Sequence, residues 1–237
     1  MKFKAFTLAE VLITLGIIGV VASVTLPSLS VDVEKRKIAP ALAKAINTLE
    51  NANKLALVEY EVRSLDEITD KNGVAANNAT RYIETVINKY VVMSKQTYNK
   101  RDYKDEGTNN ATFNPGTHSY TTKDGISYFT WTGDNNNIMS ATAGDLCPNA
   151  EFLSCRYYNI IVDINGPLKG ANSLGKDVFY LMIDTKGMVF PAGSMSYRKN
   201  NSSNLWTATC ENNKKPTIPG TCSASIVEQG WQVLYKL

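Results

Sequence analysis

The chain has 237 residues, of which 43% are hydrophobic and 20% charged, and its 25 Lys and Arg stand against 22 Asp and Glu. This composition excludes an intrinsically disordered chain, which combines low hydrophobicity with high net charge, and a protein with many membrane spans. The length suits one or two domains, and a formal net charge of +3 does not by itself indicate a nucleic-acid partner.

The apolar residues are concentrated near the N-terminus. The run from Phe6 to Val31 carries a single charge, Glu10. As a helix that rises about 1.5 Å per residue, this run is about 39 Å long, which is enough to cross a hydrocarbon layer of about 30 Å. Lys2 and Lys4 precede it, and cationic flanks stay on the cytoplasmic side, so we expect one membrane span with the rest of the chain outside.

A cleaved secretory signal is the alternative. Val20-Val21-Ala22 before Ser23 would serve as its small-residue cleavage site. Glu10 distinguishes the two interpretations, because a carboxylate at the edge of an apolar helix costs a few kcal/mol when it has no partner and is usually kept for a function.

The run from Lys4 to Ala22, KAFTLAEVLITLGIIGVVA, resembles the N-terminus of type IV pilins and of the pseudopilins of type II secretion systems. The resemblance implies that a prepilin peptidase cuts between Ala5 and Phe6 and N-methylates Phe6; Ala5 stands where the family usually has Gly. The later segments Val162 to Gly193 and Cys222 to Trp231 are similar to C-terminal segments of pilin-like proteins.

The resemblance also implies a role for Glu10 in assembly. Cleavage frees an ammonium on Phe6, and Glu10 of one subunit can pair with that terminus of a neighbour in a filament core of low dielectric. The implied partners are other pilin or pseudopilin subunits, an inner-membrane assembly platform with a separate ATPase, and the lipid bilayer. The implied location is the bacterial inner membrane, followed by a pilus or pseudopilus in the periplasm or at the cell surface.

A long helix follows the apolar run. Pro27 predicts a kink or break and Pro40 a further bend, and the helix is expected to continue to about Tyr60. We therefore divide the chain into a leader, residues 1–5; a transmembrane and filament-core helix, 6–31; and an exterior domain, 32–237. The apolar stripe of the second half of the helix comprises Ile38, Ala41, Leu42, Ala45, Ile46, Leu49, Ala52 and Leu55.

The remaining pattern predicts an α+β fold, in which the long helix packs on a small antiparallel sheet. A second amphipathic helix is expected from Asn78 to Met93, and a polar loop or short hairpins from Lys95 to Asp124. The strands are expected at Ile126 to Thr132, Tyr157 to Ile164, Val178 to Asp184 and Met188 to Pro191, followed by a short helix that stops at Gly230.

All four cysteines lie in the expected exterior domain, where an even number indicates disulfides. We favour Cys147 with Cys155 and Cys210 with Cys222, because each pair closes a short loop. A cross-link between the two regions and a zinc site built from all four cysteines remain open.

Oxygen-bearing side chains around a Gly-rich turn form a candidate calcium site. Asp163, Asn165 and Asp177 are the residue types that Ca²⁺ prefers, and some pseudopilins bind calcium in a loop of this domain. The spacing differs from an EF-hand, and Asp-Asn-Gly is also ordinary turn chemistry, which is the interpretation we favour. No cofactor is required.

The sequence shows no enzymatic motif. Its one histidine, His118, is expected in a polar loop, so a Ser-His-Asp triad and HExxH are both excluded, and no nucleotide-binding motif is present. The Tyr, Lys and Arg residues of 98–104 are interpreted as a solvated loop, so nucleic acid is not an expected partner. We expect a structural filament subunit, or alternatively a minor pilin that binds a surface, DNA or secreted cargo.

Overall fold

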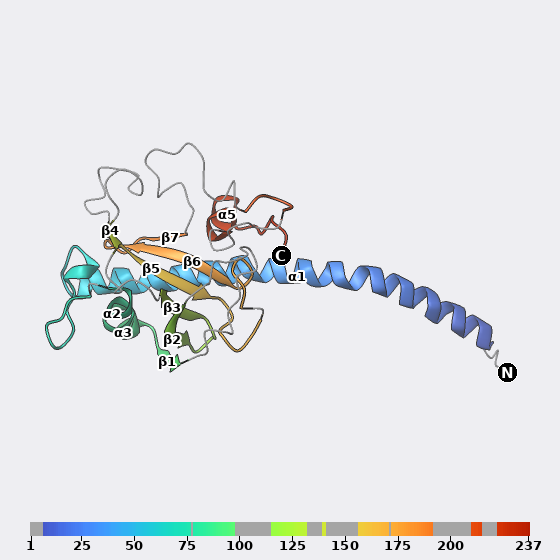
Figure 1. Cartoon of the computed structure of the whole chain (residues 1–237), viewed down its shortest axis with the longest axis horizontal. Helices are drawn as coiled ribbons and strands as arrows, with labels where there is room; N and C mark the ends of the chain where they lie inside the picture. Colours follow the sequence, from blue (N-terminus) through green and yellow to red (C-terminus); the bar gives the residue numbers. More distant parts are fainter. Residues whose placement is uncertain are drawn as a thin grey trace.

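A single long helix and one antiparallel sheet make up most of the computed structural model, which describes residues 7–76, 78–97, 115–131, 139–140, 156–170, 172–191, 210–214 and 222–237. Helix α1 runs from Leu8 to Glu59. Figure 1 shows that its second half lies against the sheet and that its first half projects from this head as a gently curved rod. The α+β class and the long N-terminal helix agree with the sequence.

Helix α1 is continuous through both prolines, as expected of one long helix, and Pro27 does not break it. The expected end near Tyr60 is correct, because Glu59 is the last helical residue and Tyr60 is the C-cap.

The sheet is an antiparallel meander with the order β1-β2-β3-β5-β6-β7, to which β4 is added beside β5. Its strands are β1 (Met93–Thr97), β2 (Pro115–Thr122), β3 (Ser127–Trp131), β4 (Met139–Ser140), β5 (Arg156–Asp163), β6 (Val178–Asp184) and β7 (Val189–Pro191). The four strands expected from strand-like runs between Gly- and Asn-containing turns correspond to β3, β5, β6 and β7. The region expected as a loop or short hairpins contributes β1 and β2, so His118 lies on a strand rather than in a loop.

The shorter helical segments flank α1. They are η1 (Leu65–Glu67), the continuous turns α2 (Ala79–Arg81), η2 (Tyr82–Ile87, a π-helix) and α3 (Asn88–Tyr90), and the C-terminal α5 (Cys222–Glu228). The second helix expected from the sequence is therefore present, capped by the side chain of Asn78, but it ends before Met93, which starts β1.

The core lies between α1 and one face of the sheet. Alternate residues of β5 and β6 point toward the helix, and the facing pairs Ile160 with Leu181 and Val162 with Phe179 are almost completely buried. A smaller cluster that includes Phe129 and Ile161 covers the opposite face. On α1 the buried positions follow steps of four and three residues: Ile38, Leu42, Ala45, Leu49, Ala52 and Ala56.

The end of the predicted stripe differs from the structure. Leu55 is 55% exposed, whereas Ala56 and the polar Asn53 are buried. The reason is the helical period of about 3.6 residues, which makes the step after Ala52 four residues rather than three.

Asn53 joins three elements inside the core. Its Nδ2 donates to the carbonyl of Gly187 in the β6–β7 turn at 2.9 Å, and its Oδ1 accepts from the Tyr82 hydroxyl at 2.6 Å. Tyr82 also stacks on Tyr158 of β5 with ring centroids 4.5 Å apart. Gly187 has φ +89°, and a Cβ there would lie 2.8 Å from the Cβ of Asn53. Both groups of the buried amide are therefore satisfied, and any larger residue at position 187 would push the helix away.

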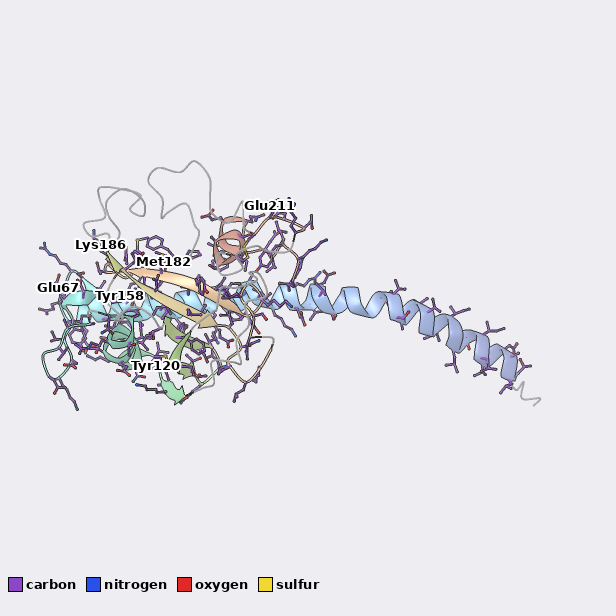
Figure 2. All side chains as sticks on the ribbon, in the orientation of Figure 1. Glu67, Tyr120, Tyr158, Met182, Lys186 and Glu211 are labelled. Atoms are coloured by element: carbon purple, nitrogen blue, oxygen red, sulfur yellow. A yellow bond between two sulfur atoms is a disulfide. The ribbon has the colours of Figure 1, made fainter. Side chains whose placement is uncertain are left out.

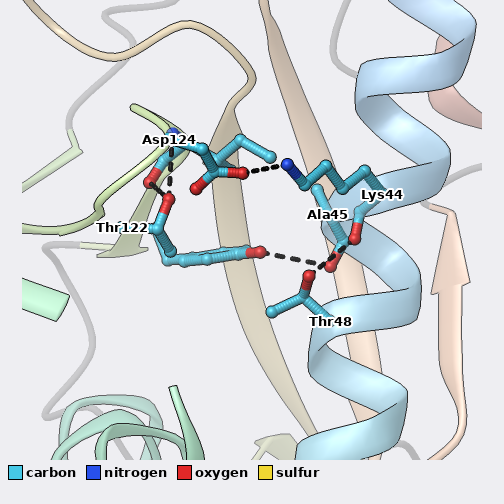
Figure 3. A network of polar contacts seen from close by, with 7 residues as sticks. Lys44, Ala45, Thr48, Thr122 and Asp124 are labelled. Atoms are coloured by element: carbon cyan, nitrogen blue, oxygen red, sulfur yellow. Dashed lines mark hydrogen bonds and ion pairs between the residues drawn. The ribbon is translucent and has the colours of Figure 1, made fainter. Parts of the chain in front are cut away.

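A second polar contact fixes α1 to the β2–β3 turn (Figure 3). Lys44 forms an ion pair with Asp124 and thereby holds the pKa of that carboxyl below its ordinary range. Beside this pair, the hydroxyl of Tyr128 donates to the Ala45 carbonyl at 3.2 Å. The ion pair is solvent-exposed and contributes about 0–1 kcal/mol at most, so the apolar core carries the attachment of the helix.

We predict that Asn53→Ala destabilises the head strongly. The substitution leaves the Tyr82 hydroxyl and the Gly187 carbonyl without their partner, and each such buried group costs about 1–3 kcal/mol, so we expect a loss of about 2–6 kcal/mol. Chemical denaturation of the detergent-solubilised protein, followed by circular dichroism, measures this loss. Asn51→Ala, at an exposed position on the same helix, is the matched control; equal losses for the two variants would contradict the prediction.

Candidate assembly site

The projecting half of α1 exposes an apolar surface on all sides. Leu8, Val20 and Val24 are 79%, 67% and 71% exposed, and the most apolar window of the helix has none of its residues buried. Figure 2 shows its side chains pointing outward all around the rod, away from the head. By length and composition this helix can cross a membrane. An amphipathic helix of a soluble protein would instead bury one face and expose polar residues on the other.

Three hydroxyl groups of this half make hydrogen bonds within the helix. Thr14 donates to the carbonyls of Glu10 and Val11, Ser23 donates to Val20, and Thr25 donates to Val21, at distances of 2.8–3.0 Å. Such bonds to the preceding turn are how Ser and Thr satisfy their hydroxyls where water is absent. These three polar residues are therefore compatible with an apolar environment.

The helix begins with a capping box. The Thr7 hydroxyl oxygen accepts from the backbone N–H of Glu10 at 3.2 Å, and Glu10 Oε2 accepts from the Thr7 N–H at 2.9 Å and from its hydroxyl at 2.8 Å. This reciprocal arrangement satisfies N–H groups that the first helical turn leaves without carbonyl partners, and it places a negative charge at the positive end of the helix dipole. Glu10 thus has a structural role within its own chain.

The sequence-based interpretation missed the participation of Thr7. The signal was present, because Thr at position 7 and Glu at position 10 have the spacing of a capping box immediately before an apolar run.

The other expected site residues lie far from this end of the helix or are not described. Ala5 and Phe6, the expected cleavage site, and Cys147 and Cys155 lie outside the described residues. The cysteines Cys210 and Cys222 form a disulfide in the head, which is the pairing favoured from the sequence. This bond joins residues 210–214 to the start of α5, close to where α1 leaves the head.

The loop between β5 and β6 holds the residues considered for calcium. Asp163 Oδ1 accepts from the N–H groups of Asn165 and Gly166 at 3.1 and 2.8 Å. Asp177 accepts from the N–H groups of Asn172 and Ser173 at 2.9 and 2.7 Å. These carboxylates therefore hold the backbone of the loop in its turns, in agreement with the turn interpretation favoured from the sequence.

Some oxygens of this loop have no such bond. Asn165 Oδ1 and Asn172 Oδ1 are buried without a hydrogen-bond partner. Among the described residues, no three His, Cys, Asp or Glu side chains gather in a metal-binding group. Calcium binding stays a prediction from the sequence.

Comparisons of the chain with models of known protein families, with curated proteins and with solved structures return no significant match. The chemistry of the site therefore has to be argued from its own residues.

We predict that Asp177→Ala lowers the free energy of unfolding by about 2–4 kcal/mol, because it leaves two buried backbone N–H groups without an acceptor. The loss should be the same in calcium and in a chelator if the carboxylate acts only on the backbone. Thermal and chemical denaturation in both conditions measure it, with Lys169→Ala, exposed in the same loop, as the control. A deficit that appears only with calcium would instead identify Asp177 as a metal ligand.

Proposed function

We propose that the chain is a prepilin-like subunit of a type IV pilus or a type II secretion pseudopilus. It is inserted in the bacterial inner membrane, cut between Ala5 and Phe6 by a prepilin peptidase, and polymerised through α1. The observation that carries the proposal is the fully exposed apolar half of α1, which the head leaves uncovered and whose first turn contains the single charge Glu10.

Cleavage at the proposed position is compatible with a stable helix. The capping box uses Thr7 and Glu10, which both follow the cut, so removal of residues 1–5 leaves the start of α1 intact. The new ammonium on Phe6 would then stand at the positive end of the helix dipole, where a cation is unfavourable without a nearby anion. Glu10 supplies this anion in the first turn.

The carboxylate of Glu10 can also pair with the N-terminal ammonium of a neighbouring subunit. The hydrogen bonds that Glu10 accepts from described residues end on Oε2, which leaves Oε1 available within that part of the chain. In a filament core without water, the ammonium of an adjacent Phe6 is the donor best suited to Oε1. Breaking one partner of such a buried pair costs about 3–5 kcal/mol, because the remaining charge stays buried and uncompensated.

The remaining partners follow from this role. The lipid bilayer surrounds α1 before assembly, and neighbouring copies of the helix replace lipid afterwards. An assembly platform in the membrane with a separate ATPase drives the transfer, since this chain has no nucleotide-binding motif.

We predict that Glu10→Gln abolishes filament assembly while leaving the subunit folded and inserted. Glutamine keeps a side-chain oxygen that can accept from Thr7, so the cap survives, but the charge that pairs with the ammonium is lost. A loss of about 3–5 kcal/mol per contact reduces assembled protein by a hundredfold or more. The amount of subunit in sheared filaments, relative to total membrane-bound subunit, measures the effect.

Thr7→Ala is the matched control. It removes the hydroxyl of the cap, which costs about 1 kcal/mol of helix stability, and leaves the charge of Glu10 in place. We expect this variant to assemble. Normal assembly of Glu10→Gln together with failure of Thr7→Ala would reverse the assignment and make the cap, rather than the charge, the feature needed for assembly.

A further inference from the structure

A pocket lies at the neck of the molecule, where α1 leaves the head. Its volume is about 500 Å³, and it lies between α1, which contributes Lys35, Arg36 and Pro40, and the C-terminal tail, which contributes Trp231 and Val233. We call it the neck pocket. Figure 1 shows the C-terminus beside the point where the projecting half of α1 begins. The pocket thus brings together residues of α1 and of the C-terminal tail that are far apart in the sequence.

The position of the neck pocket along α1 is informative. Lys35 is about 36 Å from Val11, measured along a helix that rises about 1.5 Å per residue. The hydrocarbon core of a bilayer is about 30 Å thick, and the whole bilayer with its headgroups is about 40–45 Å thick. If the apolar half of α1 crosses the membrane with Glu10 at the inner boundary, the pocket lies among the headgroups of the outer leaflet.

The lining of the neck pocket combines cationic and apolar groups. Lys35 and Arg36 provide the charges, and Ala39, Pro40 and Val233 provide an apolar wall. Arginine binds phosphate through two parallel N–H bonds and lysine binds it as a point charge, so this pair suits a phosphate ester. Among the described residues, none of those that line the pocket is acidic.

Acidic groups do occur close by, but outside the lining. Asp32 and Glu34 precede Lys35 on the exposed part of α1. Glu211, labelled in Figure 2 at the same end of the head, is paired with Lys214. Lys37 follows Arg36 and is exposed, so cations outnumber anions on the last helical turn before the head.

The backbone of the tail presents Trp231 at this boundary. Gly230 and Trp231 both have left-handed backbone conformations, with φ values of +73° and +61°. A residue other than glycine rarely adopts this backbone conformation, and such a strained residue is held in place by its surroundings. Trp231 is nevertheless 41% exposed. Tryptophan is enriched where membrane meets water, because its ring is apolar and its N–H needs a polar partner.

We propose that the neck pocket binds the headgroup of an acidic phospholipid in the outer leaflet of the membrane that α1 crosses. Lys35 and Arg36 contact the phosphate, the apolar wall receives the start of the acyl chains, and Trp231 rests at the boundary beside them. The bound lipid fixes the head against the membrane surface at one height and orientation before assembly. The proposal rests on the membrane insertion that is part of the proposed function.

The test uses the full-length protein in a mild uncharged detergent. Dihexanoyl phosphatidylglycerol and, separately, dihexanoyl phosphatidylcholine are titrated below their micellar concentrations, and binding is measured by calorimetry. We expect saturable binding of the phosphatidylglycerol, at least tenfold tighter than that of the phosphatidylcholine. The double variant Lys35→Ala/Arg36→Ala should lose this selectivity, and Trp231→Ala should weaken the binding of both lipids.

The control variant Arg63→Ala/Lys71→Ala removes the same number and types of charge from exposed positions at the opposite end of the head, the end at which Figure 2 labels Glu67. It should bind like the wild type. Equal affinity for the two lipids, or an equal loss in the control variant, would overturn the proposal. Occupation of the pocket by a second copy of the chain would also overturn the proposal. In that case, the Arg36→Cys variant in lipid-free detergent becomes better protected from alkylation as the protein concentration rises.

Insertion is measured separately, so that the two failures can be told apart. Co-flotation of the protein with phosphatidylcholine vesicles after carbonate extraction reports whether α1 enters the bilayer. A protein that fails to float contradicts the proposed function. A protein that floats but shows no lipid selectivity contradicts only the inference about the neck pocket.

Discussion

The apolar surface of the projecting half of α1 needs an environment that the described part of the chain does not provide. Burying apolar surface stabilises by roughly 25 cal/mol per Å², so a rod with Val, Leu and Ile on every side is strongly driven out of water. The hydroxyls of Thr14, Ser23 and Thr25 already make hydrogen bonds inside the helix, and Glu10 is the single charged residue in 8–31. The hydrocarbon core of a membrane meets this requirement, and so would the packed apolar helices of the proposed filament.

The head is organised so that it does not depend on that half. The core begins at Ile38 and involves the second half of α1, one face of the sheet, the π-helical turn and the C-terminal tail. Asn53 and Lys44 join the helix to the turns that follow β6 and β2. Helix α1 continues without a break from Leu8 to Glu59, so the same helix forms the apolar rod and, in its second half, part of the core of the head.

Much of this arrangement can be predicted from the sequence wherever a segment has a strong apolar pattern. The apolar run is long enough to predict a span, and β5 and β6 are runs of mostly β-branched, aromatic and other apolar residues. Strand β1, with the polar sequence Met93 to Thr97, has no such pattern and forms because it pairs with β2. Asn53 could not be predicted as a core residue, since its burial depends on Tyr82 and Gly187, which are distant in sequence. The neck pocket was missed for the same reason, because Lys35 and Trp231 are far apart in the sequence.

The residues of the β5–β6 loop have the composition of a cation site and the hydrogen bonds of a turn. Asp163 and Asp177 accept from backbone N–H groups of the loop itself, in agreement with the turn interpretation that the sequence favours, and calcium binding stays a prediction. Glu10 caps the helix, a role that was not predicted from the sequence, and its pairing with a neighbouring terminus stays a proposal.

The mass of the N-terminal peptide of protein extracted from membranes tests the central claim most directly. We predict that the mature chain begins at Phe6 and carries one additional methyl group on its terminal nitrogen. A chain that begins at Ser23 would show that the apolar run is a cleaved secretory signal and would contradict both the anchoring and the assembly role of α1.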